Sequence, residues 1–356
     1  MGHGYPIALN IYTANGGDLS LYGTCNSAAT DDRVIFTFKE VVTVTQIKFE
    51  FRKVNTMHNW TATAKEIQFL QPDNADANKV IDLFGDYAQL TVKDEYKSSL
   101  SQIRNGVSNL ISYESALKPL LDRADAIVNG QLKKDSRREF STDKNAENVI
   151  TQYGDLRAYA GGTLKMSSFG INRQVLGVGG LKGDKITVYV EADDGDPMPT
   201  IAFTQVKGDW RSWQSSYRLA RGKNVLTFPN FITDNYTWST VAGGPIHIIN
   251  PYEPSQQSSN VKVYVEGGFL YPVFRKGGDV DAFRNELTAY YNAMQNTAGM
   301  CDVAELVGDH FLHTVSAKNA YNDFITRSVN PQKNAEGWDN YIGKLLEFDG
   351  IALSPD

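Results

Sequence analysis

Apolar and polar positions alternate along the N-terminal part of the chain. In the stretch QIKFEF, Ile47, Phe49 and Phe51 alternate with polar residues. A period of two is typical of a strand with one face in water. The turn signal NGGD at 15–18 interrupts this pattern between two such segments. We therefore predict a β-rich domain over residues 1–72.

The period changes after residue 72, where apolar positions recur every three to four residues. The two runs consist of Leu100, Ile103, Val107 and Leu110, and of Leu117, Leu121, Ala124 and Val128. This spacing places each run on one face of an α-helix. We predict a helical connector over residues 73–135 and a polar, glycine-containing linker over 136–163.

A second alternating region follows the linker. In DKITVYVE, the apolar Ile186, Val188 and Val190 share one face, and turn residues separate similar segments. This pattern predicts an antiparallel β-sandwich over 164–275. From 276 to 356 the spacing becomes mostly helical, with the clearest helices in DVDAFRNELTAYYNAM and SAKNAYNDFI. The predicted fold class is a multidomain α+β protein, in which antiparallel β-sandwich domains are joined by helical segments.

Composition narrows the function classes. The chain has 356 residues, a formal net charge of -6 and two cysteines. The acidic balance argues against nucleic acid as a partner, because nucleic acids select clustered Lys and Arg. No stretch of about 18 apolar residues occurs, so we predict no membrane span. The N-terminus MGHGYPIALN lacks the features of a signal peptide, and we expect the chain to begin partway into a domain.

Two loop-like motifs have more than one interpretation. The glycines of LGVGGLKGDKI, 176–186, lack the third glycine of a dinucleotide-binding loop, so we interpret them as a turn into a strand. The segment EADDGDP, 191–197, has four acids in seven residues. Such a loop can hold calcium through oxygen ligands, but its spacing departs from that of an EF-hand and favours a solvated hairpin turn.

An aromatic group is the candidate ligand site. It lies in polar, loop-like contexts and consists of Trp210, Trp213, Tyr217, Tyr236 and Trp238. Flat aromatic faces stack well on ligand CH groups and are enriched at binding sites. The alternative interpretation is that these residues cover an edge of the sandwich, and the sequence leaves both open.

His310 and His313 look at first like a metal site. A metallopeptidase helix needs two histidines four residues apart and a glutamate directly after the first, and this segment has neither feature. HFLHTV is better interpreted as a short strand before Ser316, which would cap the following helix. Because neighbouring strand positions alternate between faces, we expect no shared metal ion here.

The region 166–350 resembles the enhancin-like, mucin-degrading zinc metallopeptidases. The resemblance lies in the order and spacing of MSSFGINRQVLGVGGLKGDKITVYVEAD, LARGKNVLTF, AGGPIHIINPY and VKVYVEGGFLYPVFRKGG. It covers about half the chain. The segment 33–73, RVIFTFKEVVTVTQIKFEFRKVNTMHNWTATAKEIQFLQPD, resembles the C-terminal half of a discoidin-type, galactose-binding-like module.

The resemblance implies a zinc site, but the motif that forms this site in the family does not occur in this sequence. In that family the motif HExxH and a more distant glutamate hold zinc, and no HExxH occurs in these 356 residues. No catalytic or metal-binding residue is therefore carried over, and we expect this polypeptide alone to lack peptidase activity.

The resemblance implies the following function. The chain would be the N-terminal, non-catalytic part of a secreted or cell-surface peptidase that binds zinc in its full length. Residues 1–72 would be a partial carbohydrate module and 276–356 a truncated catalytic region, with glycoprotein or mucin glycans as partners. The alternative is a stand-alone carbohydrate-binding or adhesion protein that has lost its peptidase.

Overall fold

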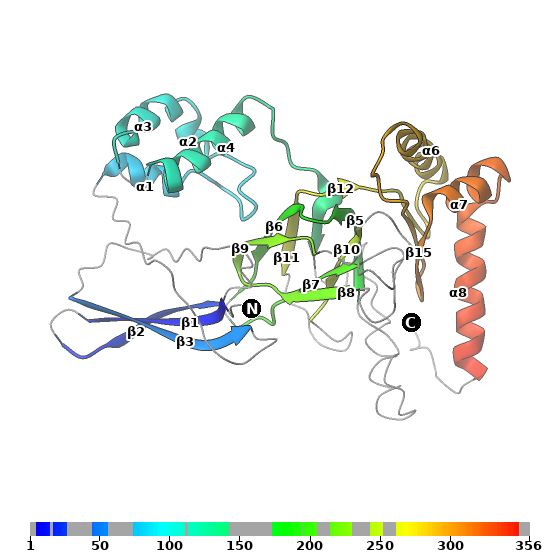
Figure 1. The fold of residues 1–356 in the computed structure, drawn as a ribbon, viewed down its shortest axis with the longest axis horizontal. Helices are drawn as coiled ribbons and strands as arrows, with labels where there is room; N and C mark the ends of the chain where they lie inside the picture. Colours follow the sequence, from blue (N-terminus) through cyan, green and yellow to red (C-terminus); the bar gives the residue numbers. More distant parts are fainter. Residues whose placement is uncertain are drawn as a thin grey trace. The chain divides into compact units, whose positions relative to one another are not determined.

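A computed structural model describes most of the chain. The described residues are 5–14, 17–26, 45–55, 74–110, 113–141, 173–193, 195–204, 214–229, 243–251 and 261–348. By the contacts between their residues they divide into two compact units, whose helices and strands are labelled in Figure 1. The first contains the described residues up to Ser136 together with Tyr189–Glu191, and the second contains the others.

The first unit contains a three-stranded antiparallel sheet. Its strands are β1 (Tyr5–Ala14), β2 (Ser20–Asn26) and β3 (Gln46–Asn55), in the order β2-β1-β3. The alternation in QIKFEF falls in β3, where Lys48 is exposed and the neighbouring Ile47 and Phe49 are partly buried. The predicted strand is thereby confirmed.

The first unit also contains a small group of helices. They are α1 (Ala75–Ile81), α2 (Asp94–Lys97), α3 (Leu100–Val107) and α4 (Lys118–Val128), with the π-helical turn Tyr113–Leu117 before α4. The apolar runs predicted from the sequence are confirmed as their core, which includes Ile103, Val107 and Leu121. Val128 differs, because it ends α4 with its side chain 44% exposed.

Two larger sheets lie in the second unit, except for the last three residues of β6, Tyr189–Glu191, which are grouped with the first. Their strands are β4 (Glu139–Ser141), β5 (Arg173–Leu181), β6 (Lys185–Glu191), β7 (Thr200–Thr204), β8 (Gln214–Arg218), β9 (Gly222–Thr227), β10 (Gly243–Ile249), β11 (Lys262–Glu266) and β12 (Phe269–Leu270). One sheet has the order β12-β5-β10-β7-β8 and the other β4-β11-β6-β9. Strand β4 lies inside the segment predicted as a linker, because Phe140 is buried and β4 pairs with β11.

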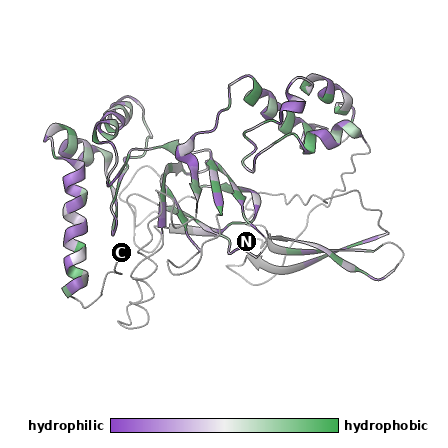
Figure 2. Cartoon of the chain, turned by 180° about the vertical axis from the view of Figure 1, so that it is seen from behind, coloured by the Kyte–Doolittle hydropathy of each residue, from purple (hydrophilic) through white to green (hydrophobic). Residues whose placement is uncertain are grey.

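Aromatic side chains connect these two sheets. Phe203 of β7 lies with its ring centroid 5.1 Å from that of Phe228, which directly follows β9. The predicted inward face of β6 is confirmed, since Ile186, Val188 and Val190 are at most 1% exposed. In Figure 2 the central strands carry both hydrophobic and hydrophilic segments. These contacts are of the kind that a sandwich requires.

The two segments predicted as turns, 176–186 and 191–197, differ in how far the structure agrees with the prediction. In the segment 176–186, the predicted turn into a strand is confirmed at Gly183, which has a φ of 87° in the turn before β6. The earlier glycines lie within β5, and a side chain on Gly180 would overlap the ring of Phe228, so close packing explains that glycine. The acidic segment 191–197 is not a hairpin, because β6 and β7 belong to different sheets. The segment between β6 and β7 instead connects the two sheets. Alternating hydrophobicity predicts a strand but not the strand with which it pairs.

The C-terminal part of the second unit combines helices with a small sheet. Its elements are β13 (Val273–Arg275), α6 (Val280–Asn296), β14 (Ala304–Val307), β15 (Leu312–Val315), α7 (Ala317–Tyr321), the π-helical segment Asn322–Thr326 and α8 (Pro331–Phe348). The sheet has the order β13-β14-β15. Its first pair of strands is parallel and its second antiparallel. The chain is therefore an α+β protein.

The predicted elements of this region are confirmed at their caps. Asp279 accepts hydrogen bonds from the first backbone N–H groups of α6, and Ser316 caps α7 directly after β15. Helix α8 is not one of the helices named from the sequence, although it lies in the region 276–356 that is predicted to be mostly helical. Its start is nevertheless marked by Asn330, whose side chain accepts from the Lys333 N–H, and by Pro331 at the first helical position.

Candidate functional site

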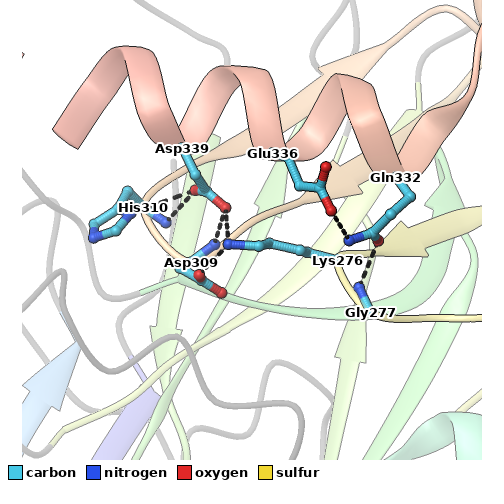
Figure 3. A network of polar contacts seen from close by, with 7 residues as sticks. All are labelled: Lys276, Gly277, Asp309, His310, Gln332, Glu336 and Asp339. Carbon is cyan, nitrogen blue, oxygen red and sulfur yellow. Dashed lines mark hydrogen bonds and ion pairs between the residues drawn. The ribbon is translucent and has the colours of Figure 1, made fainter. Parts of the chain in front are cut away.

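A polar network joins α8 to the small sheet (Figure 3). At its centre is Asp339 of α8, which is 5% exposed. Asp339 accepts hydrogen bonds from the backbone N–H groups of Asp309, at 3.1 Å, and of His310, at 2.9 Å. These two residues form the turn between β14 and β15. The carboxylate therefore satisfies donors of that turn which strand pairing leaves open.

Lys276 completes this network from the end of β13. Its Nζ lies 3.0 Å from Asp339 and also pairs with the exposed Asp309. Burial raises the pKa of the Asp339 carboxyl, but the two backbone hydrogen bonds and Lys276 lower it more, so that it lies below its ordinary value. Beside it, the Gly277 N–H donates to Gln332 of α8 at 2.8 Å. Three segments distant in sequence are thus held together.

An aromatic group lies on the same helix. The ring of His313 is 4.6 Å from that of Trp338 and 4.6 Å from that of Phe311, and Trp338 meets Tyr341 edge to face at 6.0 Å. Trp338 is 40% and Tyr341 59% exposed. Burial lowers the pKa of His313. This histidine serves as a packing surface for the tryptophan.

A second polar group surrounds a buried carboxylate in the same unit. Glu305 of β14 is 0% exposed and accepts hydrogen bonds from Tyr271 at 2.6 Å and from Thr314 at 2.7 Å. His247 of β10 lies 2.8 Å from the same carboxylate through Nε2. Its Nδ1 faces Arg173 at 3.4 Å, and because a guanidinium only donates, Nδ1 accepts and Nε2 donates to Glu305.

The burial of Glu305 determines whether this polar group acts on a substrate or stabilises the fold. Burial lowers the pKa of Arg173 to about 10. Burial by itself raises the pKa of Glu305, but His247 and the hydroxyl donors lower it more, so that it lies below its ordinary value of 4.5. A carboxylate with no exposed surface cannot reach a substrate. The group therefore holds the five-stranded sheet to β14 and β15.

These two carboxyls predict a loss of stability in acid. A pKa that folding lowers stabilises the protein above the unfolded pKa, and this contribution disappears as the pH falls through the folded pKa. We expect the melting temperature of the second unit to fall below about pH 4.5 for Glu305 and at still lower pH for Asp339. Thermal unfolding followed by circular dichroism measures this.

The Glu305→Gln variant is the control for the acid prediction. It melts earlier than the wild type at neutral pH, and the difference between the two proteins should narrow as the pH falls. A constant difference from neutral pH to about pH 3 would contradict the assigned role of Glu305.

The aromatic residues predicted as a ligand site are only partly described. Tyr217 lies in β8, and its ring packs 5.6 Å from that of Phe203, so it contributes to the sheet. Trp210, Trp213, Tyr236 and Trp238 lie outside the described residues. The structure therefore leaves the candidate site as a prediction.

The strand predicted for the histidine pair is confirmed for His313 only, because β15 begins at Leu312. His313 lies in β15, and His310 precedes that strand with Nδ1 3.4 Å from Asp339. Within the described ranges no group of three or more His, Cys, Asp or Glu side chains could hold a metal ion. The described residues thus do not fit the zinc site that the resemblance implies.

Solved structures provide the informative comparisons. No protein-family model and no curated protein matches the sequence. A structure of the CBM32-1, CBM32-2 and M60 catalytic domains of Clostridium perfringens ZmpB matches 99% of this chain and 36% of its own, with a TM-score of 0.63 at 21% identity. No helix among the described residues is long and apolar enough to cross a membrane.

Two further structures match a shorter part of the chain. The catalytic module of Clostridium perfringens ZmpA is 25% identical over 59% of this chain and 40% of its own, with a TM-score of 0.50. The M60 catalytic domain of ZmpC, in complex with the sialyl T antigen, is 26% identical over 61% and 41%, with a TM-score of 0.51. The structural neighbours are thus M60-like, or enhancin-like, zinc metallopeptidases, and this chain spans about two-fifths of their length.

Proposed function

We propose that this chain is the N-terminal, non-catalytic part of a secreted zinc metallopeptidase that acts on glycoproteins or mucins. The observation that carries the proposal is the match to the ZmpA and ZmpC catalytic domains. Zinc in this proposal belongs to the full-length parent.

Each region predicted from the sequence has its own role in this proposal. Residues 1–72 form part of a carbohydrate-binding module, 73–135 a connector, 136–163 a linker, 164–275 an accessory β-sandwich and 276–356 the opening of the catalytic region. Within this last region, the polar network of Lys276, Asp309 and Asp339 joins the small sheet to α8.

Glycan contact is assigned to the predicted aromatic group, Trp210, Trp213, Tyr217, Tyr236 and Trp238. The ZmpC neighbour is a complex with the sialyl T antigen, which supports a glycan as the ligand class. Aromatic rings bind sugars through their flat faces, and tryptophan offers the largest one. Because Tyr217 packs beside Phe203, we expect the tryptophans to contribute most.

A glycan array tests this assignment. We expect Trp210→Ala and Trp213→Ala each to weaken binding of mucin-type glycans about tenfold or more, a loss of ~1.4 kcal/mol or more. Tyr341→Ala, which removes an exposed aromatic ring on α8, should leave binding unchanged. Unchanged binding in both tryptophan variants would show that these residues are structural.

A further inference from the structure

Helix α8 has three distinct faces. At about 100° per residue, Ala335, Asp339 and Ile342 fall on one narrow arc. These residues are buried or partly buried against the core of the second unit. A second arc faces away from the core and carries polar residues. They are Lys333, Glu336, Asn340, Lys344 and Glu347. The helix is thus already anchored along one side.

The third face of α8 is apolar and exposed. Trp338 is 40%, Tyr341 59%, Leu345 44% and Phe348 89% exposed. Their spacing of three, four and three residues places them within an arc of about 80°. We name these four residues the α8 stripe. In Figure 2 the mostly hydrophilic colouring of α8 gives way to paler and green segments toward its C-terminal end.

The α8 stripe is energetically suited to burial. Covering a side chain the size of Leu345 or Phe348 contributes about 1.5–3 kcal/mol. A helix that is apolar on more than one side is typically enclosed by more than one layer of structure. In the described structure the core side of α8 is covered through Ala335 and Ile342, and of the stripe only Trp338 packs on other rings, those of His313 and Phe311. The stripe is therefore a contact surface.

The chemistry of the stripe limits what can cover it. A glycan needs polar partners for its hydroxyl groups, and Leu345 and Phe348 offer none. A stable homodimer buries about 1,200–2,000 Å² in total, more than four side chains on a single helix provide. A further layer of structure in the same folded chain loses no translational or rotational freedom when it covers the stripe. It therefore does not need the buried area of a stable dimer.

We propose that the α8 stripe is the packing face for the part of an M60-like peptidase domain that has no counterpart in these 356 residues. The argument from length is that this chain spans 40% of the ZmpA module and 41% of the ZmpC domain. The inference rests on the proposed function and adds the surface by which this chain supports the catalytic region. The Lys276–Asp339 network fixes the orientation of α8 for that contact.

The first test identifies the occupant. In the ZmpA and ZmpC structures, the residues that superpose on Trp338, Tyr341, Leu345 and Phe348 are expected to be apolar. They should be covered by the part of each chain that has no counterpart here. Polar or solvent-exposed residues at these positions would overturn the proposal, as would cover by a second molecule.

The second test uses the full 356-residue chain in solution. We expect a monomer in sedimentation that binds a hydrophobic fluorescent dye, and the double variant Leu345→Asp, Phe348→Asp should lose most of that fluorescence. Lys344→Asp, on the polar face, should retain it. All proteins should keep the wild-type circular dichroism, because the altered side chains are exposed.

Two solution results would contradict the proposal. A dimer that the double variant disrupts would assign the stripe to a second copy of the chain. Equal dye binding in all variants would mean that the stripe is already covered. Neither result affects glycan binding by Trp210 and Trp213, so failure of this inference is distinguishable from failure of the proposed function.

Discussion

Replacing Glu305 with alanine is expected to lower the free energy of unfolding of the second unit by about 3–5 kcal/mol. The substitution leaves the His247 Nε2–H and the hydroxyls of Tyr271 and Thr314 without their acceptor. Glu305, His247 and Tyr271 are buried, so water cannot replace the carboxylate beside those two donors without opening the structure, whereas Thr314 is exposed. Urea unfolding monitored by circular dichroism measures the loss.

Glu336→Ala is the matched control for this prediction. Glu336 is an exposed glutamate of α8 that bonds Gln332, and its loss should change stability by no more than about 0.5 kcal/mol. If Glu305→Ala prevents folding, Thr314→Val removes one donor only and should cost about 1 kcal/mol. Equal stability of Glu305→Ala and Glu336→Ala would refute the structural role of the buried group.

The second large effect is expected at Asp339. Asp339→Ala removes the acceptor of two backbone N–H groups and one of the two carboxylates that pair with Lys276. We expect a loss of about 3 kcal/mol, since hydrogen bonds to a charged group contribute more than neutral ones. The loss should be local, and hydrogen exchange should accelerate at the amides of α8 and of the β14–β15 turn.

Asp309→Ala distinguishes the ion pair with Lys276 from the hydrogen bonds that Asp339 accepts from the β14–β15 turn. It removes the other carboxylate that pairs with Lys276, but Asp309 is 55% exposed at its side chain. Its loss should therefore cost only about 0–1 kcal/mol. A similar loss in both variants would mean that pairing with Lys276, and not the bonds to the turn, holds α8 in place.

The local predictions succeeded where a single element determines its own pattern. Ile103, Val107 and Leu121 are buried as their spacing indicates, and Ser316 caps α7. The resemblance to enhancin-like metallopeptidases agrees with the structural neighbours. Helix α8, which was not named from the sequence, had a start signal in Asn330 and Pro331, but Gly337 and Gly343 weaken its helical pattern.

The predictions failed where partners are distant in sequence. The acidic segment 191–197 has the composition of a hairpin turn, yet its flanking strands join different sheets. The pairing of strands depends on the closure of long loops and on burial, neither of which the local period records. For the same reason the glycine at 180 is explained by the ring of Phe228 and not by a turn.

The sequence by itself determined the α+β class, the strand patterns of β3 and β6, the helices α3, α4, α6 and α7, and the absence of an HExxH motif in these residues. Only the tertiary structure decided that His247 meets Glu305 across 58 residues, that Asp339 holds the β14–β15 turn, and that one apolar face of α8 stays exposed. The physical reason is that periodicity shows which side of an element is apolar. Which surface covers that side depends on the packing of elements that are far apart in the chain.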